Sequence, residues 1–503
     1  MGSRWTLRPE LQLIEHLLAK DPRLYEFLRK VDLGLFTKGA IKVEQVETGL
    51  LQLTVQVNNT AVGTRAILNL LNGTNVTLAG VDDAGNLRIN VTINAATQTT
   101  PIFPPGRPDL TKCAIIGGLI SLSAGGIGNT HRTPFCHNGI GTLGLTNIFP
   151  MPRGGWVFNP KVWLSNTEIA RTLSIFGLEK GGTDSATGEV AWDTAIQDLP
   201  ASGVYGDGKS LVYYNDFEGL RLETGTRGAN ESGIYSAWAA AAFMDEGLPI
   251  GLTTSGQGAG NTVYLSIAGG GQATVTTEAA MRCPLPGGTL KRMVVRVITA
   301  PSGAAVTDLT WMKSGVATGL TISIPSTAGV GSFFTELSTT VTFADGEQIT
   351  LENKTTGGIT GAACIVGVIY VPTVANSALL WFHKGGAFVS SPTENYQMAF
   401  MRVLAQTNES LTVLPLPRGG TLAGADCRLY VETVLGAGRS ITIHVRKNAA
   451  NSGVSWSLTD ATPIGTLAAS GSATFAEDDR INLYETGNGG STGLLAGASL
   501  LLR

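Results

Sequence analysis

The side chains of this sequence that could do chemistry are spaced unfavourably for it. None of the five histidines lies two or four residues from another, the spacings at which a strand or a helix presents two metal ligands together. They are His16, His131, His137, His383 and His444. Cys136 and His137 are adjacent, so on a strand they point to opposite faces and form no nucleophile–base pair. The sequence therefore predicts neither a metal site nor a catalytic Cys–His pair.

Acidic clusters are the remaining candidates, because glycan-hydrolysing enzymes use paired carboxylates that can be distant in sequence. The clusters are Asp82-Asp83, Asp207, Asp216 with Glu218, and Asp478-Asp479. The first three lie close to glycine or asparagine in turn sequence, where acidic side chains commonly bind the backbone. No D-x-D-x-D-G calcium loop is present in the sequence. We expect no enzyme activity and no cofactor.

The composition limits the classes of binding partner to be expected. The 503 residues suffice for several domains, and 35 basic residues nearly balance 38 acidic ones, so neither nucleic acid nor a membrane is an expected partner. Only 15% of the residues are charged and 65 are glycine. This composition favours surface buried in an oligomer, although a β protein rich in threonine and serine would look similar.

The cysteines are scattered, without any CxxC pair: Cys113, Cys136, Cys283, Cys364 and Cys427. We expect buried free thiols rather than disulfides or a zinc site. The opening MGSRWTLRPELQ has no long apolar segment, and no run of 18 apolar residues occurs. We therefore expect no signal peptide and no membrane span, and a protein made in a cytosol or released from it by lysis.

Residues 1–39 carry the clearest helical signal. Apolar residues recur at helical spacing over residues 8–30, and Asp21-Pro22 predicts an N-cap with proline at the first position of a second helix. This amphipathic segment needs a groove for its apolar stripe, either in partner copies or in another protein. The expected docking residues are Leu11, Ile14, Leu17, Leu18, Leu24, Phe27 and Leu28.

From residue 40 the period of the apolar residues changes to two, which predicts strands in a small β domain at 40–96. Val76 and Leu78 share one strand face, and apolar residues alternate with polar ones from residue 87 to residue 93. Between them, Asp83-Ala84-Gly85-Asn86 is typical of a tight turn. The sequence predicts a half-buried hairpin here.

The same stretch, VGTRAILNLLNGTNVTLAGVDDAGNLRINVTI at 62–93, resembles a segment that recurs in structural proteins of tailed bacteriophages. That segment has a G-[ST]-R-x-x-L-N-[FL] opening, an N-[VI]-T strand, a D-D-x-x-N-x-[RN] turn and an N-V-T-I close. Ala66 departs from it, since proline is frequent there. The resemblance implies a virion protein, typically a tail or capsid fibre. The matching positions are Gly63, Thr64, Arg65, Leu68, Asn69, Asn75, Val76, Thr77, Asp82, Asp83, Asn86, Arg88 and Asn90 to Ile93.

After a proline-rich linker at 97–109, the chain repeats itself. CPLPGGTL at 283–290 returns as LPLPRGGTL at 414–422, and more faintly as PMPRGGW at 150–156, with the glycine pairs 133 and 132 residues apart. TFADGEQITL and TFAEDDRINL, which begin at Thr342 and Thr474, are also 132 residues apart. Lysines end corresponding hairpins at Lys180, Lys313 and Lys447. These landmarks predict three tandem domains.

The length and the strand-and-turn texture of each copy are typical of an eight-stranded jelly roll or a related β-sandwich. We expect a mainly β protein with three tandem β-sandwich domains at 110–252, 253–373 and 374–503, each a bead with its own core. The segment 236–244, SAWAAAAFM, fits either a buried strand or a short helix.

Tyr396 and Trp456 lie in loop-like sequence and are the possible glycan contacts, since an exposed ring can stack on a sugar. The alternative for Trp456 is a residue of the sandwich core.

The expected function is a non-enzymatic virion protein: a surface-projecting fibre, docked through its N-terminus to tail, baseplate or capsid, forming a homotrimer and meeting a host-surface glycan. The alternatives are a capsid decoration or head-fibre protein that stabilises the shell, and a glycan-degrading tail spike. Fold alone decides none of these.

Overall fold

The computed structural model divides into two compact units, residues 1–98 and 99–503. It describes residues 40–45, 51–56, 76–83, 88–95, 113–122, 130–135, 149–164, 174–181, 203–206, 211–226, 234–244, 246–267, 275–384, 395–400, 402–403, 408–487 and 495–503. These residues are mainly β-strand, as expected. The predicted N-terminal helices and their seven docking residues lie outside the described residues.

The first unit contains two antiparallel strand pairs. β1 (Ala40–Gln45) pairs with β2 (Leu51–Gln56), and β3 (Val76–Asp83) pairs with β4 (Arg88–Ala95). The second pair runs in register from Val76 opposite Ala95 to Asp83 opposite Arg88. This is the hairpin that the alternating sequence predicted.

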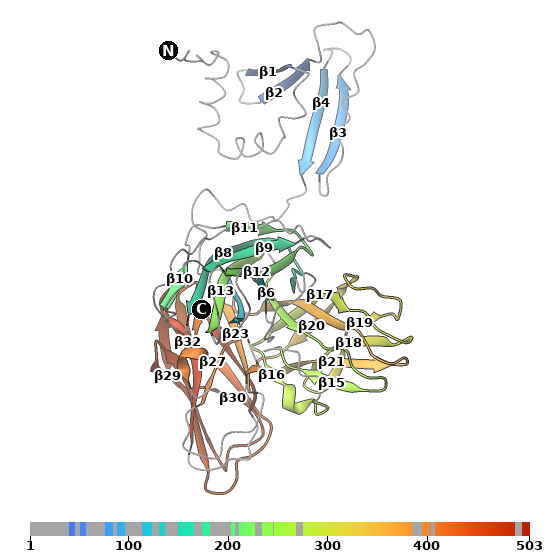
Figure 1. Cartoon of the computed structure of the whole chain (residues 1–503). Helices are drawn as coiled ribbons and strands as arrows, with labels where there is room; N and C mark the ends of the chain where they lie inside the picture. The colour runs from blue at the N-terminus through green and yellow to red at the C-terminus, as the bar shows by residue number, and fades with distance from the viewer. Residues whose placement is uncertain are drawn as a thin grey trace. The chain divides into compact units, whose positions relative to one another are not determined.

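The second unit holds three modules, and module 2 shows their topology most completely (Figure 1). One sheet has the order β14 (Leu248–Thr253), β22 (Ala363–Pro372), β17 (Gly288–Thr299) and β20 (Phe333–Phe343). The other has the order β15 (Thr262–Leu265), β21 (Gln348–Thr356), β18 (Val306–Lys313) and β19 (Val316–Ile324), and the short β16 (Cys283–Pro284) also pairs with β21. Apart from β16, the strand order is 1-8-3-6 and 2-7-4-5, which is that of a jelly roll.

Module 3 repeats this order. Its first sheet contains β23 (Ala378–Lys384), β33 (Leu495–Leu502) and β27 (Gly420–Val431), with β30 (Gly465–Ala468) and β31 (Ser472–Phe475) together in the sixth position and β25 (Arg402–Val403) beside β23. Its second sheet contains β24 (Asn395–Gln397), β32 (Arg480–Gly487), β28 (Ser440–Lys447) and β29 (Ala450–Thr459), with β26 (Leu414–Pro415) beside β32.

Among its described residues, module 1 has counterparts of these strands except the fifth. One sheet contains β5 (Ala114–Leu122), β13 (Ile234–Met244) and β8 (Gly155–Leu164), which pairs with β10 (Gly203–Gly206) and β11 (Leu211–Tyr214). The other contains β6 (Thr130–Pro134), β12 (Gly219–Thr226), β9 (Ser174–Gly181) and β7 (Phe149–Pro150). The ambiguous segment at 236–244 is therefore a strand. Because β14 pairs with β22, module 2 begins at β14 and not at residue 253.

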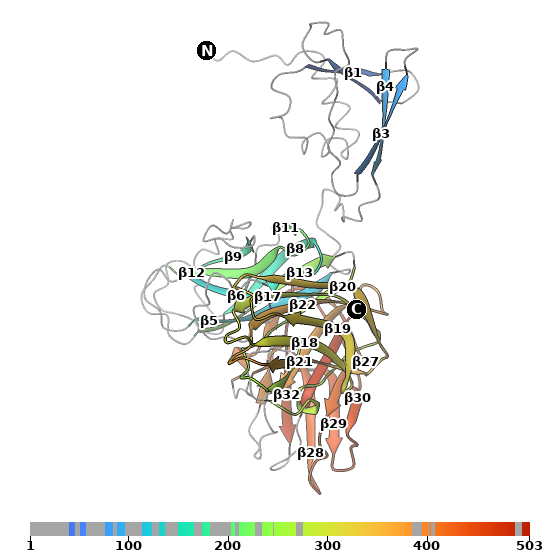
Figure 2. The same cartoon turned by 90° about the vertical axis from the view of Figure 1, so that its right-hand side faces the viewer.

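The expectation of three separate cores is wrong. One cluster of buried side chains runs through all three modules, which form a single body in the two views (Figures 1 and 2). Phe135 of module 1 packs edge-on against Trp381 and Phe400 of module 3, with ring centroids 6.2 and 5.7 Å apart. The reason is that the outer faces of the first sheets are apolar and are covered by neighbouring modules, as the next section describes.

Four cysteines lie among the described residues, and all are buried thiols: Cys113, Cys283, Cys364 and Cys427. This confirms the expectation of buried thiols for these four. Burial raises the pKa of Cys364 to about 12, so its thiolate is scarce at neutral pH and the thiol is a poor nucleophile.

Candidate functional site

The two repeated sequence landmarks meet in space. In each module a four-residue turn precedes the seventh strand, and a short segment that we call the clip precedes the third. The turns are residues 215–218, 344–347 and 476–479, and the clips are residues 149–155, 283–288 and 414–420. In module 2 the Leu285 N–H donates to the Glu347 carbonyl at 2.8 Å, and the Gly346 N–H donates back to the Leu285 carbonyl at 2.8 Å. Met151 and Leu416 make the same pair of bonds with their own turns.

An acid closes each turn. In module 2, Glu347 Oε2 accepts from the Ala344 N–H at 2.6 Å, and Gly346, which precedes Glu347, has a left-handed φ of 84°. The equivalent bonds join Asn215 to Glu218 at 2.7 Å and Ala476 to Asp479 at 2.6 Å. Glu218 serves the backbone, as the sequence predicted for the cluster of Asp216 and Glu218, and Asp479 does the same although no such prediction was made for it.

Two of the repeated lysines bind these acids. Lys313 Nζ lies 2.8 Å from Glu347 Oε2, and Lys447 Nζ lies 2.9 Å from Asp479 Oδ2. Burial alone would raise the pKa of Glu347, but the Lys313 ammonium and the Ala344 N–H bring it below its ordinary value. Asp479 behaves alike: against its burial, the Ala476 N–H and Lys447 lower its pKa. The side chain of Lys180 lies outside the described part.

Each clip packs on the first sheet of the next module. Strand β7 contacts β17 and β22 of module 2, β16 contacts β27 and β33 of module 3, and β26 contacts β8 and β13 of module 1. The three modules therefore contact one another in a closed cycle, 1 to 2, 2 to 3 and 3 to 1, which we call the ring.

Glycines make room for the clips. A Cβ added at Gly251 would lie 2.3 Å from the Phe149 ring, and one at Gly497 would lie 3.0 Å from the Cα of Cys283. At the closing interface a Cβ at Gly117 would lie 3.3 Å from Leu414. Close approach of backbone and ring thus explains part of the high glycine content.

An ion pair accompanies every clip. The second residue of each turn is an acid that binds a base on the third strand of the next module: Asp216 with Arg292 at 2.8 Å, Asp345 with Arg428, and Glu477 with Lys161 at 3.1 Å. Lys161 Nζ also lies 2.6 Å from Asp478 Oδ1. The pairs are equivalent in position, although their chemistry differs.

The surrounding contacts are specific to each interface. Between modules 1 and 2, Phe217 packs against Phe333 with ring centroids 5.3 Å apart. Between modules 2 and 3, Gln348 Nε2 donates to Thr466 Oγ1 at 2.8 Å. At the closing interface, Trp163 Nε1 donates to the Ser410 carbonyl at 2.7 Å. The three interfaces thus share a backbone plan and differ in side chains.

Arg418 of the third clip is fully buried at this closing interface. Its guanidinium donates to the carbonyls of Cys113 at 2.8 Å, Leu502 at 3.0 Å and Gly419 at 3.2 Å. It therefore joins the first described residue of module 1 to the last strand of module 3. Arg153 holds the same clip position in module 1 and is 28% exposed, with Asp216 and Glu246 as partners.

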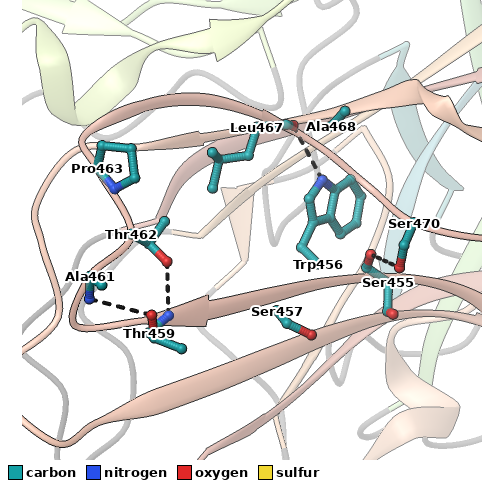
Figure 3. A pocket seen from close by; sticks show the side chains of 10 residues that line it. All are labelled: Ser455, Trp456, Ser457, Thr459, Ala461, Thr462, Pro463, Leu467, Ala468 and Ser470. Atoms are coloured by element: carbon teal, nitrogen blue, oxygen red, sulfur yellow. Dashed lines mark hydrogen bonds between the residues drawn. The ribbon is translucent and has the colours of Figure 1, made fainter.

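Neither predicted glycan contact offers an exposed ring. Trp456 is 2% exposed, and its Nε1 donates to the Leu467 carbonyl at 3.3 Å beneath a depression of about 490 Å³ (Figure 3). Tyr396 is 6% exposed and stacks on Tyr484 at 4.9 Å. The premise of an exposed stacking face fails for both, and the core alternative holds for Trp456.

Of the other sequence candidates, Asp207, Cys136 and His137 lie outside the described residues. Within the described part of the chain, no three His, Cys, Asp or Glu side chains are grouped to hold a metal ion. Over the same residues, no helix has the length and apolar character to cross a bilayer. What sequence reasoning missed is the ring, although the clip and the turn were both detected as repeats.

Comparisons with known proteins give no sequence match and only distant structural alignments. No family model matches the chain, and no curated protein matches it. Among solved structures, a chain of Sulfolobus Turreted Icosahedral Virus aligns at 11% identity over 85% of this chain and 88% of that one, with a TM-score of 0.16. A chain from an archaeal virus described by its triple jelly roll fold and turret assembly aligns at 11% identity over 85% and 87%, with a TM-score of 0.15. At these TM-scores neither alignment carries an argument.

Proposed function

We propose that this chain is a structural protein of a virus particle, with no enzymatic activity, whose ring forms a compact head attached through the N-terminal unit. The observation that carries the proposal is that the charged turn residues and the apolar clips of the ring contact neighbouring modules. The acid at the second position of every turn binds the next module, and each clip covers a neighbouring sheet. Side chains that could have formed a binding site build the architecture instead.

Two further observations support a particle component. Jelly rolls are a frequent fold of viral shells, although they also form lectins and other domains. The segment 62–93 resembles tailed-phage virion proteins, and part of it forms the β3–β4 hairpin. We assign the first unit, with its amphipathic start, to attachment on tail, baseplate or capsid.

Within this role, the ring favours a compact surface unit over a fibre of three beads in a row. In a row, module 3 would contact module 2 alone, whereas here it also packs on module 1 through β26. Decoration of the capsid is therefore our first assignment, and a tail fibre that meets the host is the second.

Immuno-electron microscopy of intact particles tests this, with an antibody raised against residues 377–503 and the same antibody pre-absorbed on purified protein as the control. Label over the capsid supports decoration, and label confined to the tail supports the fibre. Unlabelled particles, with the protein free in the lysate, would overturn the virion assignment.

A further inference from the structure

The ring has the connectivity of a cyclic trimer within one chain. Head-to-tail contacts generate a closed ring when the rotation between neighbours returns to its start. Here three equivalent contacts close the ring, because the third clip packs on module 1. The turn acids Asp216, Asp345 and Glu477 mark the same position in each step.

The ring leaves none of its own contacts open. Three clips and three first sheets pair one to one among the described residues, so no clip remains to recruit a second copy. The low charge and the high glycine content suggested surface buried in an oligomer. Contacts between modules explain part of this composition, because Gly251 lies against Phe149 and Gly497 lies against Cys283.

The modules are also not interchangeable. An aromatic pair, an amide–hydroxyl bond and an indole–carbonyl bond distinguish the three interfaces. A module placed beside the wrong neighbour would leave such partly buried polar groups without partners, which costs binding energy. The order of the modules is thus set by side chains as well as by the chain connection.

We propose that this protein occupies a threefold position of its particle as a single copy, and that its partner is an assembly of three equivalent subunits around that axis. One chain repeats the same clip and turn three times around the ring and so can contact three equivalent subunits alike. This rests on the proposed virion role, and it replaces the homotrimer that the fibre resemblance implied.

The first test needs no particle. Light scattering on the purified full-length protein over a hundredfold range of concentration should give one chain, 52.4 kDa. Three times that mass would overturn the proposal and leave the virion role intact. The second test counts copies per threefold site in purified particles by quantitative mass spectrometry. One copy supports the proposal, and three copies contradict it.

Opening the ring should convert the monomer into multimers, because the freed clip of one chain can bind the freed sheet of another. Lys161→Glu places a third negative charge beside Glu477 and Asp478. Lys161→Met is the milder variant if the first does not fold, and Lys354→Glu, on an exposed position of β21, is the control. Multimers that grow with concentration in a Lys161 variant alone support closure within one chain. Monomers of unchanged stability in both Lys161 variants would contradict it.

Discussion

Asp345 and Arg428 lie 83 residues apart in the chain and join two modules by a two-pronged ion pair, with Arg428 Nε 3.1 Å from Asp345 Oδ1. Their counterparts occur at the other two interfaces of the ring. The contact is therefore a repeated feature of the architecture, and its variants test whether the ring stabilises the protein.

Reversing one charge should destabilise the protein, and reversing both should restore it. Asp345 is 55% exposed, so we expect Asp345→Arg or Arg428→Asp alone to lower the free energy of unfolding by about 1 kcal/mol. The double variant should recover more than half of this loss in denaturant titrations. Additive losses in the double variant would show that the two side chains do not interact.

Filling the space under the first clip should be costly. Gly251→Ala places a methyl group against the Phe149 ring, and we expect a loss of about 1–3 kcal/mol from overpacking. Gly319→Ala is the matched control, because its nearest neighbour would be 3.6 Å away. Calorimetry should show a lower Tm for the first variant only. An equal Tm would mean that the Phe149 ring does not lie against Gly251 as described.

The buried guanidinium of Arg418 should matter more than that of Arg153. Arg418→Met leaves three carbonyls without this donor and should cost about 3 kcal/mol. Arg153→Met removes partly exposed ion pairs and should cost about 1 kcal/mol or less. Hydrogen exchange should rise in β5 and β33 for the first variant. Equal effects of the two would contradict the closing role of Arg418.

Acid should weaken the turns. The pKa values of Glu347 and Asp479 lie below their ordinary values of 4.5 and 3.8 in the folded chain. Their contribution is present above those ordinary values and is lost as the pH falls through the lowered, folded values. The Tm of Glu347→Gln should therefore fall less between pH 6 and pH 3 than that of the wild type. Parallel Tm curves would exclude Glu347 as a source of acid lability.

Trp456 should behave as a core residue. Trp456→Ala should cost about 3–5 kcal/mol, and Trp456→Phe should cost less because most of the apolar volume remains. At a temperature where Trp456→Phe is folded, particle adsorption to host cells should equal that of the wild type. Reduced adsorption with unchanged stability would restore the glycan contact.

The modules and their jelly-roll texture could be predicted because glycine pairs and turn motifs recur at nearly constant spacing. The ring could not, since nothing in the spacing of Asp216 and Arg292, 76 residues apart, marks them as partners. A weaker signal existed in β13 and β22. Both are almost continuously apolar, which is typical of strands covered on both faces.

The expectation of an exposed ring at Trp456 was wrong for a local reason. Val454, Trp456 and Leu458 alternate with serines. This period of two places all three side chains on the buried face of β29. The asparagine- and glycine-rich sequence just before Trp456 suggested a loop, but it includes the turn from β28 into β29, and the strand begins before the tryptophan.

The bond from Arg418 to the Cys113 carbonyl has a mechanical consequence. A force applied to the backbone at Cys113 acts on the residue just before β5 (Ala114–Leu122). There the load is shared between the nine residue pairs of β5 with β13 and the guanidinium that holds Leu502 of the last strand. Module 1 and module 3 therefore bear a force at Cys113 together, because Arg418 binds backbone carbonyls of both.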